Sequence, residues 1–418
     1  MEVKEYELGD LLAYEQPTPY IVESTKYSDT YKTPVLTAGK SFIIGHTNET
    51  TGIYENLPAI IFDDFTTSSQ FVNFKFKVKS SAMKILTANT EIVLPKYVFY
   101  RMQIINFDHS THKRYWIQHY SKLKVQIPSL PEQEKIIKKI EELFSELDKS
   151  VETLHTIKQQ LAVYRQAVLK EAFEGKLTSL WRKMHLGESP QTDFESIKRS
   201  NEVFKDTSGD ENEIHLELPP SWIKVRFGDV FEVQVGATPS RRIPEYWNGT
   251  INWVSSGEVH FNTILRTDEQ ITADGLAHAS TNVHPVGTVM LAMIGEGKTR
   301  GQAAILNIEA AHNQNTAAIL VSKTACSSKY IYYFLQMNYD NTRRVGSGNN
   351  QKALNKERVR ALRFPFTSFA EQKMIVEEIE SRLSVCDSIE QTVDTALVQA
   401  EAMRQSILKQ AFEGGLPE

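Results

Sequence analysis

Two segments of the chain carry residue types that could do chemistry on a phosphate. Residues 292–299 are Ala-Met-Ile-Gly-Glu-Gly-Lys-Thr, which fits a loose phosphate-loop pattern after an apolar run. Such a loop needs a helix N-terminus behind its glycines, because the free amides there hold the phosphate. Residues 303–306, Ala-Ala-Ile-Leu, instead predict another strand, and the first half of the chain has no counterpart. The sequence therefore argues against nucleotide binding.

Acidic and histidine residues suggest other catalytic sites at loose spacing. Asp274 with residues 296–298 could form the carboxylate pair of a metal-dependent nuclease, and residues 108–119 contain an aspartate and three histidines that could bind a metal. Both spacings are common by chance, and surface loops explain them better. Residues 218–221, Leu-Pro-Pro-Ser, lack the leading Asn, Asp or Ser of an adenine methyltransferase turn. We therefore expect neither a catalytic residue nor a metal site in this chain.

Loops rich in cations, amides and hydroxyls could instead contact DNA. Arg and Lys bind phosphates, Asn and Gln can pair with adenine, and Arg can pair with guanine. Such loops lie at 238–242, 298–302 and 343–352, and in the first half at 109–115, with 66–70 and 26–32 as weaker choices. Each could also be an ordinary solvated loop. The candidate DNA-binding residues are Thr238, Ser240, Arg241, Arg242, Lys298, Thr299, Arg300, Gln302, Arg343, Arg344, Ser347, Asn349, Asn350, Gln351, Lys352, His109, His112, Lys113, Arg114, Tyr115, Thr66, Thr67, Ser68 and Gln70.

The overall charge does not favour nucleic acid, but its distribution does. The formal net charge is −5, whereas DNA-binding domains are usually basic. Residues 343–363 nevertheless hold seven Lys and Arg against the single acid Glu357. Acids concentrate instead in residues 132–148 and 371–390. Positive charge is therefore local.

Length and composition predict a soluble, intracellular protein of two or more domains. The chain has 418 residues, of which 41% are hydrophobic and 24% charged. Its two cysteines, Cys326 and Cys386, are too few for a disulfide framework. No apolar run approaches the ~20 residues that span a bilayer, and the first residues do not resemble a signal peptide. We expect a cytoplasmic location and no membrane contact.

An internal repeat is the strongest signal in the sequence. Residues 130–177 align with 369–416 at a constant shift of 239, with 19 identities in 48 positions and no gap. Both copies begin with Glu-Gln and end with Ala-Phe-Glu-Gly, and Arg165 matches Arg404 between them. The repeat therefore dictates the architecture.

Each copy of the repeat predicts one long helix. Apolar residues recur at three- and four-residue steps, and each copy ends near a glycine, Gly175 or Gly414, suited to a left-handed cap. At ~1.5 Å per residue, a helix of ~43 residues is ~65 Å long, too long to lie inside a compact domain. Its apolar stripe must be covered, and the other copy is the expected partner in an antiparallel coiled coil. Alternatively, each helix could lie on its own domain or on another protein.

The segments before the two helices are similar to each other, though more weakly. Residues 6–11 match 225–230, and the aromatic run at 97–100 matches 330–333. Short apolar runs predict mostly β-structure with one or two helices in each segment. The polar residues 178–217 between the copies predict a connector.

Taken together, these features resemble the specificity subunit of type I restriction–modification systems. The resemblance rests on the doubled order of motifs: residues 131–133 open the first helix, 172–178 close it, and 218–222 lead into the second domain. The second helix is a weaker match at 370–372 and 414–416. The expected fold is α+β, with a pseudo-two-fold repeat. Its segments are a first target-recognition domain at 1–129, the first long helix at 130–177, the connector at 178–217, a second target-recognition domain at 218–368 and the second long helix at 369–416.

The resemblance also implies a function and partners. Each domain would recognise one half of a split, asymmetric double-stranded DNA sequence, and the helices would set the gap. The chain itself would have no catalytic residue and no cofactor. Two modification subunits would supply S-adenosylmethionine-dependent adenine methylation, and restriction subunits would need ATP and Mg²⁺. The alternative is a coiled-coil scaffold that does not bind DNA, which salt-dependent binding to duplex DNA would exclude.

Overall fold

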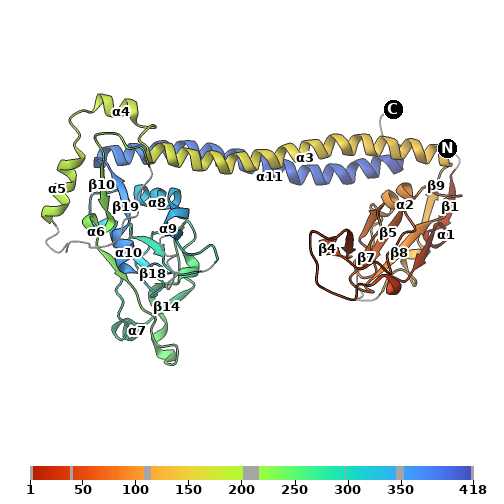
Figure 1. Cartoon of the computed structure of the whole chain (residues 1–418), viewed down its shortest axis with the longest axis horizontal. Helices are drawn as coiled ribbons and strands as arrows, with labels where there is room; N and C mark the ends of the chain where they lie inside the picture. The colour runs from red at the N-terminus through yellow and green to blue at the C-terminus, as the bar shows by residue number, and fades with distance from the viewer. Residues whose placement is uncertain are drawn as a thin grey trace. The chain divides into compact units, whose positions relative to one another are not determined.

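The computed structural model describes residues 3–37, 41–107, 114–200, 216–295, 297–344 and 353–415. The chain divides into two compact units: Met1–Ile157 with Thr392–Glu418, and Lys158–Gln391. Each unit holds one β-rich domain and one part of each of two long helices, α3 (Leu130–Phe173) and α11 (Phe369–Glu413) (Figure 1). Both helices lie inside the two repeat copies, as predicted. Among the described residues, no helix combines the length and hydropathy needed to cross a membrane.

The domain of the first unit is built around the buried strand β5. A four-stranded antiparallel sheet has the order β2-β8-β5-β6, a three-stranded sheet has the order β4-β3-β7, and β1 pairs with β9. Side chains of β5 alternate between two cores, because successive strand residues point to opposite faces: Ile60 and Phe62 pack towards α2, Ile61 towards the smaller sheet. The elements are β1 (Lys4–Glu7), α1 (Leu8–Leu11), β2 (Leu12–Glu15), β3 (Thr33–Leu36), β4 (Ile43–Thr47), β5 (Ala59–Asp63), β6 (Ser69–Val72), β7 (Lys77–Val78), β8 (Met83–Ala88), α2 (Pro95–Met102) and β9 (Lys124–Ile127).

The domain of the second unit has the same plan with more elements. Its five-stranded sheet has the order β11-β18-β15-β16-β13, beside the three-stranded sheet β14-β12-β17 and the pair β10-β19. In β15, Val289 and Leu291 enter one core while Met290 and Ala292 enter another. The elements are β10 (Ile223–Arg226), α6 (Phe227–Val230), β11 (Val233–Val235), β12 (Trp247–Val254), β13 (Asn262–Ile264), β14 (Glu269–Ile271), α7 (Ala273–Ala277), β15 (Val289–Ala292), β16 (Ala303–Leu306), β17 (Ala310–His312), β18 (Thr316–Ile319), α8 (Ser328–Met337), α9 (Tyr339–Arg344), α10 (Lys356–Ala361) and β19 (Arg363–Phe366).

Two details of this second domain bear on the sequence analysis. Residues 303–306 form strand β16, antiparallel to β15, so the glycines before them do not lead into a helix. The five helices α6 to α10 exceed the one or two that were predicted, because none is longer than ten residues and the pattern of such short helices is not periodic.

The two long helices pack together, which confirms the predicted pairing. In the first unit, Arg404 of α11 forms an ion pair with Asp148 of α3. In the second unit, Arg165 of α3 forms an ion pair with Asp387 of α11 at 2.7 Å. These are the same pair twice, because a shift of 239 converts one into the other. The earlier α3 residue Asp148 meets the later α11 residue Arg404, whereas the later α3 residue Arg165 meets the earlier α11 residue Asp387, so the helices are antiparallel.

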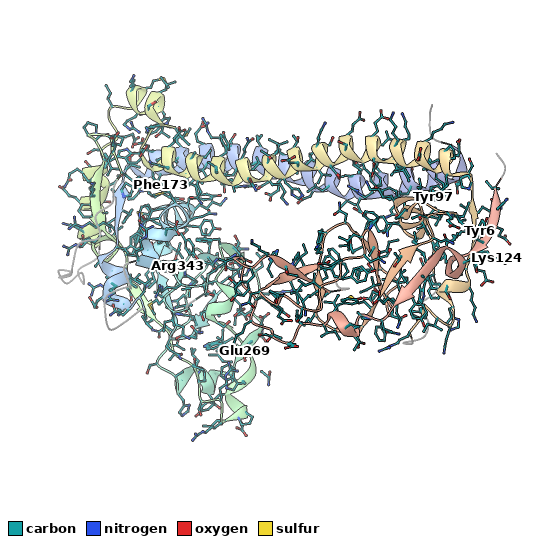
Figure 2. All side chains as sticks on the ribbon, turned by 45° about the vertical axis from the view of Figure 1, so that its right-hand side comes forward. Tyr6, Tyr97, Lys124, Phe173, Glu269 and Arg343 are labelled. Atoms are coloured by element: carbon teal, nitrogen blue, oxygen red, sulfur yellow. The ribbon has the colours of Figure 1, made fainter. Side chains whose placement is uncertain are left out.

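Each domain also packs against the last turn of the other copy's helix. Tyr97 of α2 meets the ring of Phe412, near the end of α11, with the ring centres 5.2 Å apart. Tyr330 of α8 meets Phe173, the last residue of α3, at 5.0 Å; Tyr97 and Phe173 are labelled in Figure 2. Because each Phe comes from the helix that follows the other domain, neither repeat copy completes its own core.

The glutamine of the Glu-Gln pair near the start of each repeat, Gln133 or Gln372, hydrogen-bonds backbone groups of the domain. Gln133 is fully buried; its Oε1 accepts from the amide of Leu94 at 2.8 Å, and its Nε2 donates to the carbonyls of Ile92 and Pro128 at 3.0 and 2.9 Å. Gln372 repeats this, accepting from the amide of the α8 N-cap Ser327 at 3.1 Å and donating to the carbonyl oxygen of Thr367 at 2.9 Å. The glutamines therefore fix the start of each long helix to its own domain.

Part of the predicted connector is folded. Residues 178–200 contain α4 (Ser179–Met184) and α5 (Pro190–Ser200), and Phe194 and Ile197 of α5 are buried in the core of the second unit. The sequence did not indicate this, because two apolar residues in an otherwise polar stretch do not form a recognisable helical stripe. Residues 201–215 lie outside the described part of the chain.

Candidate nucleic-acid interface

Two of the predicted DNA-binding segments meet in the second unit. Arg343, in the last turn of α9, donates from Nη2 to the carbonyl of Gly297 at 2.6 Å and lies 5.3 Å from the centre of the Tyr339 ring (Figure 2). The hydroxyl of Tyr339 donates to the carbonyl of Lys298. Helix α9 thus holds the 298–302 loop through both side chains, which leaves Lys298 itself exposed.

The third segment, 238–242, is fixed by an aromatic and acidic cluster. The guanidinium carbon of Arg241 lies over the Trp247 ring, 3.7 Å from the ring centre, and the guanidinium forms a two-pronged ion pair with Glu269 of β14. The carboxylate of Glu269 raises the pKa of Arg241, and the guanidinium lowers the pKa of Glu269, so both groups are charged at neutral pH. Arg242 next to it is exposed.

A turn that we did not predict links these segments. The hydroxyl of Thr238 donates to Oε1 of Gln314 at 2.6 Å. In the same turn, the carbonyl of Asn315 accepts from the amide of Met293 at 2.8 Å, just after β15. The carbonyl of Met293 in turn accepts from the amide of Leu354 at 3.0 Å. The 238–242 and 298–302 segments are therefore linked to the C-terminal end of β15, and Arg343 joins them through Gly297. The Asn-Gln-Asn run at 313–315 was the sequence signal for the missing member.

Two buried histidines, His284 and His312, lie next to the 313–315 turn. The Nε2 atoms of His284 and His312 are 3.1 Å apart, and Nδ1 of His312 lies 2.8 Å from the hydroxyl of Thr316. Burial lowers the pKa of His284 to about 4 and that of His312 to about 3. Both rings are therefore neutral at pH 7, and a hydrogen bond between them needs one protonated and one unprotonated nitrogen. Near neutral pH the neutral pair thus joins the 313–315 turn to His284.

In the first unit, a buried ion pair joins two predicted segments. The carboxylate of Asp64 accepts from the amide of Trp116 at 2.9 Å and lies 3.5 Å from Nζ of Lys84. The backbone carbonyl of Asp64 also accepts from the amide of Tyr115 at 2.9 Å. The 66–70 loop and the start of the described 114–116 segment consequently lie side by side.

The predicted residues of this first pair of segments differ in exposure. Thr66, Ser68 and Gln70 are exposed, and Thr67 has a positive φ of 57°. Tyr115 is only 2% exposed and packs against Phe107, so its side chain lies inside the domain rather than at the loop surface. It supports the segment and does not present itself to a ligand.

The remaining predicted residues divide into three groups. Ser240, Arg344 and Arg114 are exposed. Thr299, Arg300 and Gln302 are half-buried, and within the described residues Nε of Arg300 has no hydrogen-bond partner. Within the same part of the chain no group of three His, Cys, Asp or Glu could hold a metal. Eight candidates lie outside the described residues: His109, His112, Lys113, Ser347, Asn349, Asn350, Gln351 and Lys352.

Comparison with known proteins identifies the family. Residues 219–398 match the family model of the type I restriction modification DNA specificity domain. The specificity subunit of the Escherichia coli type I restriction enzyme EcoR124I/EcoR124II is 30% identical over 400 residues, covering 93% of this chain and 89% of that protein. The chain belongs to the specificity subunits of type I restriction–modification systems. The E. coli EcoDI specificity subunit is 23% identical over 296 residues, covering 70% of this chain and 62% of that protein.

Solved structures share the fold of this specificity subunit. A chain from the type I R-M system, solved to explain its complex assembly and conformational transition, superposes with a TM-score of 0.66 at 15% identity over 99% of this chain and 98% of its own length. The HsdS subunit of Thermoanaerobacter tengcongensis gives 0.50 at 16% identity, over 99% and 97%. The predicted family and α+β fold are therefore confirmed.

Membership of the family decides between the two functions that the sequence left open. Specificity subunits recognise DNA sequences and are non-catalytic, the methylase and nuclease activities being carried by other subunits. The prediction of a DNA-recognition subunit without enzymatic activity is confirmed, and no finding favours the scaffold without DNA.

Proposed function

We propose that this specificity subunit recognises a two-part DNA sequence, with one domain for each half and with α3 and α11 setting the gap. The observation that carries this proposal is the double occurrence of the same architectural contacts, Arg165–Asp387 and Arg404–Asp148, beside polar loops that differ between the domains. Identical supports with different loops suit a protein that holds two unlike binding surfaces at a fixed separation.

The loops of the second unit suggest how one half of the site is bound. Arg242 and Lys298 are exposed, belong to two of the segments linked to the end of β15 and have the charge that phosphates need. Thr238 and Gln314 are hydrogen-bonded to each other and carry groups that can pair with base edges. We propose that the cations set the register of the domain on the duplex and that the amide and hydroxyl groups select bases.

The same proposal includes partners that this chain does not contain. Two modification subunits would bind S-adenosylmethionine and methylate adenine, and restriction subunits would supply ATP- and Mg²⁺-dependent activity, all in the cytoplasm. The support is family membership: the E. coli relative is the specificity subunit of a restriction enzyme, and the solved neighbour comes from work on a type I R-M complex. The number of each subunit is part of the proposal.

An insertion into both helices tests the proposal. Thr156 and Thr395 are equivalent in the repeat, and seven residues inserted after each would keep the apolar stripe in phase. Two added turns lengthen the pair by ~10.5 Å, or about 3 base pairs. Sequencing of methylated adenines, in cells that also make the modification subunit, should show unchanged half-sites separated by a wider gap. An unchanged gap would contradict the role of the helices, and a change in the half-sites would contradict the role of the domains.

A further inference from the structure

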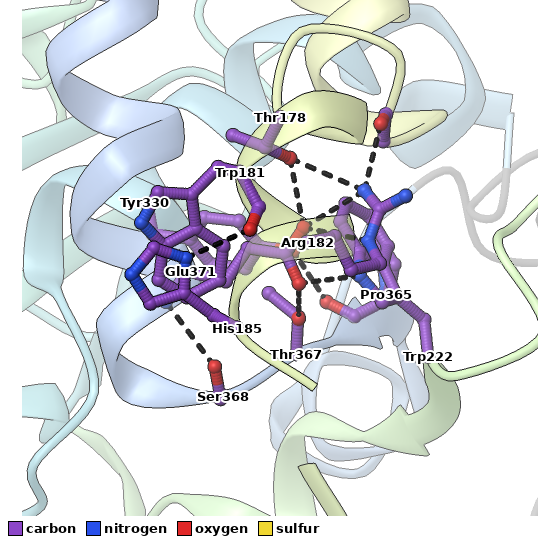
Figure 3. Close-up of polar contacts among 11 residues, drawn as sticks. Thr178, Trp181, Arg182, His185, Trp222, Tyr330, Pro365, Thr367, Ser368 and Glu371 are labelled. Carbon is purple, nitrogen blue, oxygen red and sulfur yellow. Dashed lines mark hydrogen bonds and ion pairs between the residues drawn. The ribbon is translucent and has the colours of Figure 1, made fainter. Parts of the chain in front are cut away.

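A buried glutamate at the start of α11 organises one corner of the second unit. Glu371 is 3% exposed. Its Oε1 accepts from Nε of Arg182 at 2.9 Å and from the hydroxyl of Thr178 at 2.8 Å, and Nη2 of Arg182 also lies 2.8 Å away (Figure 3). Its Oε2 accepts from the indole of Trp222 at 2.9 Å and from the hydroxyl of Thr367. Four side chains donate to this carboxylate, two of them from the segment that contains α4.

Helix α5 continues this cover over the neighbouring surface. The Phe194 ring packs against Phe366 of β19, with the ring centres 5.7 Å apart. The carboxylate of Asp193 accepts from the backbone amide of Phe369, the first residue of α11, at 2.8 Å. The first amides of a helix have no hydrogen-bond partner inside the helix. The Asp193 carboxylate provides one for the amide of Phe369. Residues 178–197 therefore cover a surface formed by Phe366, Phe369 and Glu371.

The repeat identifies the same surface in the first unit, where a cavity takes the place of this cover. A shift of 239 converts Phe366, Phe369 and Glu371 into Ile127, Leu130 and Glu132. These three line a cavity of about 460 Å³, which we call the Glu132 pocket. Its lining is Lys4, Tyr6, Glu91, Ile92, Ile127, Pro128, Ser129, Leu130 and Glu132, with Tyr6 labelled in Figure 2.

The Glu132 side chain has fewer hydrogen-bond and ion-pair partners than that of Glu371. It is 27% exposed, and its ion pair is with Lys135 of the same helix at 3.5 Å. Within the described residues of the first unit no arginine contacts it. The segment Thr-Ser-Leu-Trp-Arg that serves Glu371, residues 178–182, occurs once in the sequence. Of the two equivalent surfaces, the described residues 178–197 cover only the one around Glu371.

We infer that the Glu132 pocket is a docking site for a partner protein that supplies the missing cover: a helical segment that places an arginine on Glu132. The second unit shows the chemistry that such a surface accepts, namely a guanidinium on the carboxylate and an apolar side chain on the end of the β1–β9 pair. A guanidinium matches a carboxylate with paired hydrogen bonds and opposite charge. The inference rests on the proposed assembly with modification subunits, of which one would contribute the segment.

Thiol labelling in the assembled complex tests whether the pocket is covered. Ser129 lines the pocket and is exposed, so Ser129→Cys introduces a reporter while Glu132 stays in place. Glu134→Cys, exposed on another face of α3, is the matched control. The native Cys326 and Cys386 are buried and give little background. We expect maleimide labelling at position 129 to slow at least tenfold when modification subunits bind, with less than a twofold change at 134. Equal rates at position 129 with and without partners would overturn the inference.

A synthetic peptide tests the arginine separately. Residues 176–200 of this chain form the probe, because they carry Arg182, Asp193 and Phe194 in the geometry that covers Glu371. The full chain should bind this peptide, and Glu132→Gln in the chain or Arg182→Ala in the peptide should each weaken binding about tenfold, with little further loss when combined. Binding that is insensitive to Glu132→Gln, or no binding, would overturn the assigned chemistry. Methylated-adenine sequencing reports the proposed function independently, so a chain that directs methylation without protecting position 129 contradicts only this inference.

Discussion

The two units share the contacts that join each domain to the long helices, but the equivalent glutamates Glu132 and Glu371 have different surroundings. Both fix the start of a long helix with a buried glutamine, Gln133 or Gln372, and both place a tyrosine on the final phenylalanine of the other helix. Both glutamates border cavities, but Glu371 is 3% exposed and accepts from four side chains, whereas Glu132 is 27% exposed and forms its ion pair with Lys135 of the same helix. Contacts that recur in both units serve the architecture, and a contact made in only one unit points to a role that the architecture does not require.

The comparison also separates support from recognition in the loops. In the second unit the polar loops surround one strand end, with a neutral histidine pair beneath them. In the first unit a buried aspartate and lysine, Asp64 and Lys84, hold the corresponding predicted loops together. The two domains thus hold their loops with different contacts. Four measurements test whether the two units differ in these ways.

The largest difference in unfolding free energy between the two units should come from replacing Glu371 and Glu132, each separately, by alanine. Glu371→Ala leaves Arg182 and the Trp222 indole without their acceptor, and loss of one partner from a buried pair costs about 3–5 kcal/mol. Glu132→Ala should cost less than about 1 kcal/mol, because its side chain is partly exposed and its ion pair lies at the surface. Urea unfolding followed by tryptophan fluorescence will report the second unit through four of the five tryptophans and the first unit through Trp116. Equal losses would remove the distinction between the two sites.

Acid should destabilise the second unit before the first. Burial depresses the folded-state pKa of His284 to about 4 and of His312 to about 3, so between pH 6.5 and 4 the unfolded chain binds protons that the folded unit does not. Stability is therefore complete above pH 6.5 and falls as pH drops, by roughly 2 kcal/mol per ring at pH 5. Hydrogen exchange at pH 7 and pH 5 can follow both units in one sample. His284→Asn should reduce the pH dependence, and uniform destabilisation of both units would contradict this account.

The two glutamines should give matched, smaller losses. Gln133→Leu and Gln372→Leu each remove a side chain that bonds buried backbone groups, and an unsatisfied buried group costs about 1–3 kcal/mol. The expected result is a similar shift for each variant, Gln133→Leu in the first unit and Gln372→Leu in the second. Exchange rates of the amides of Leu94 and Ser327 report the local opening directly. A large loss in one unit only would show that the repeat is not equivalent at its helix starts.

The smallest effect concerns a single cation at the proposed interface. Arg242→Ala should weaken binding of the assembled complex to duplex DNA by less than about tenfold and reduce the salt slope by about 1, without changing which bases are preferred. The effect should be the same whichever bases occupy the half-site. Lys373→Ala, which removes an exposed cation from α11, is the matched control and should leave the slope unchanged. A changed base preference would make Arg242 a base contact instead.

The candidate site was partly predictable from the chain alone. Segments 238–242, 298–302 and the start of 343–352 were identified by their cations and amides, and the structure brings the described parts around one strand end. Gln314 was missed although it lies in an Asn-Gln-Asn run, because its relevance depends on Thr238, 76 residues away. The burial of Tyr115 was equally hidden, since an aromatic residue beside an arginine suits a DNA-binding loop as well as a core.

What the sequence determined by itself is the duplicated plan. A repeat of 48 positions, an apolar stripe of helical period and a glycine near the end of each copy require two long helices whose stripes must be covered. What only the tertiary structure decided is which partner each group meets. Phe173 packs against Tyr330 and Phe412 packs against Tyr97. Arg182 pairs with Glu371, one of the two glutamates that are equivalent in the repeat. Periodicity is a local property of the chain and survives in the sequence, whereas long-range contacts depend on the packing of distant segments and leave no local pattern.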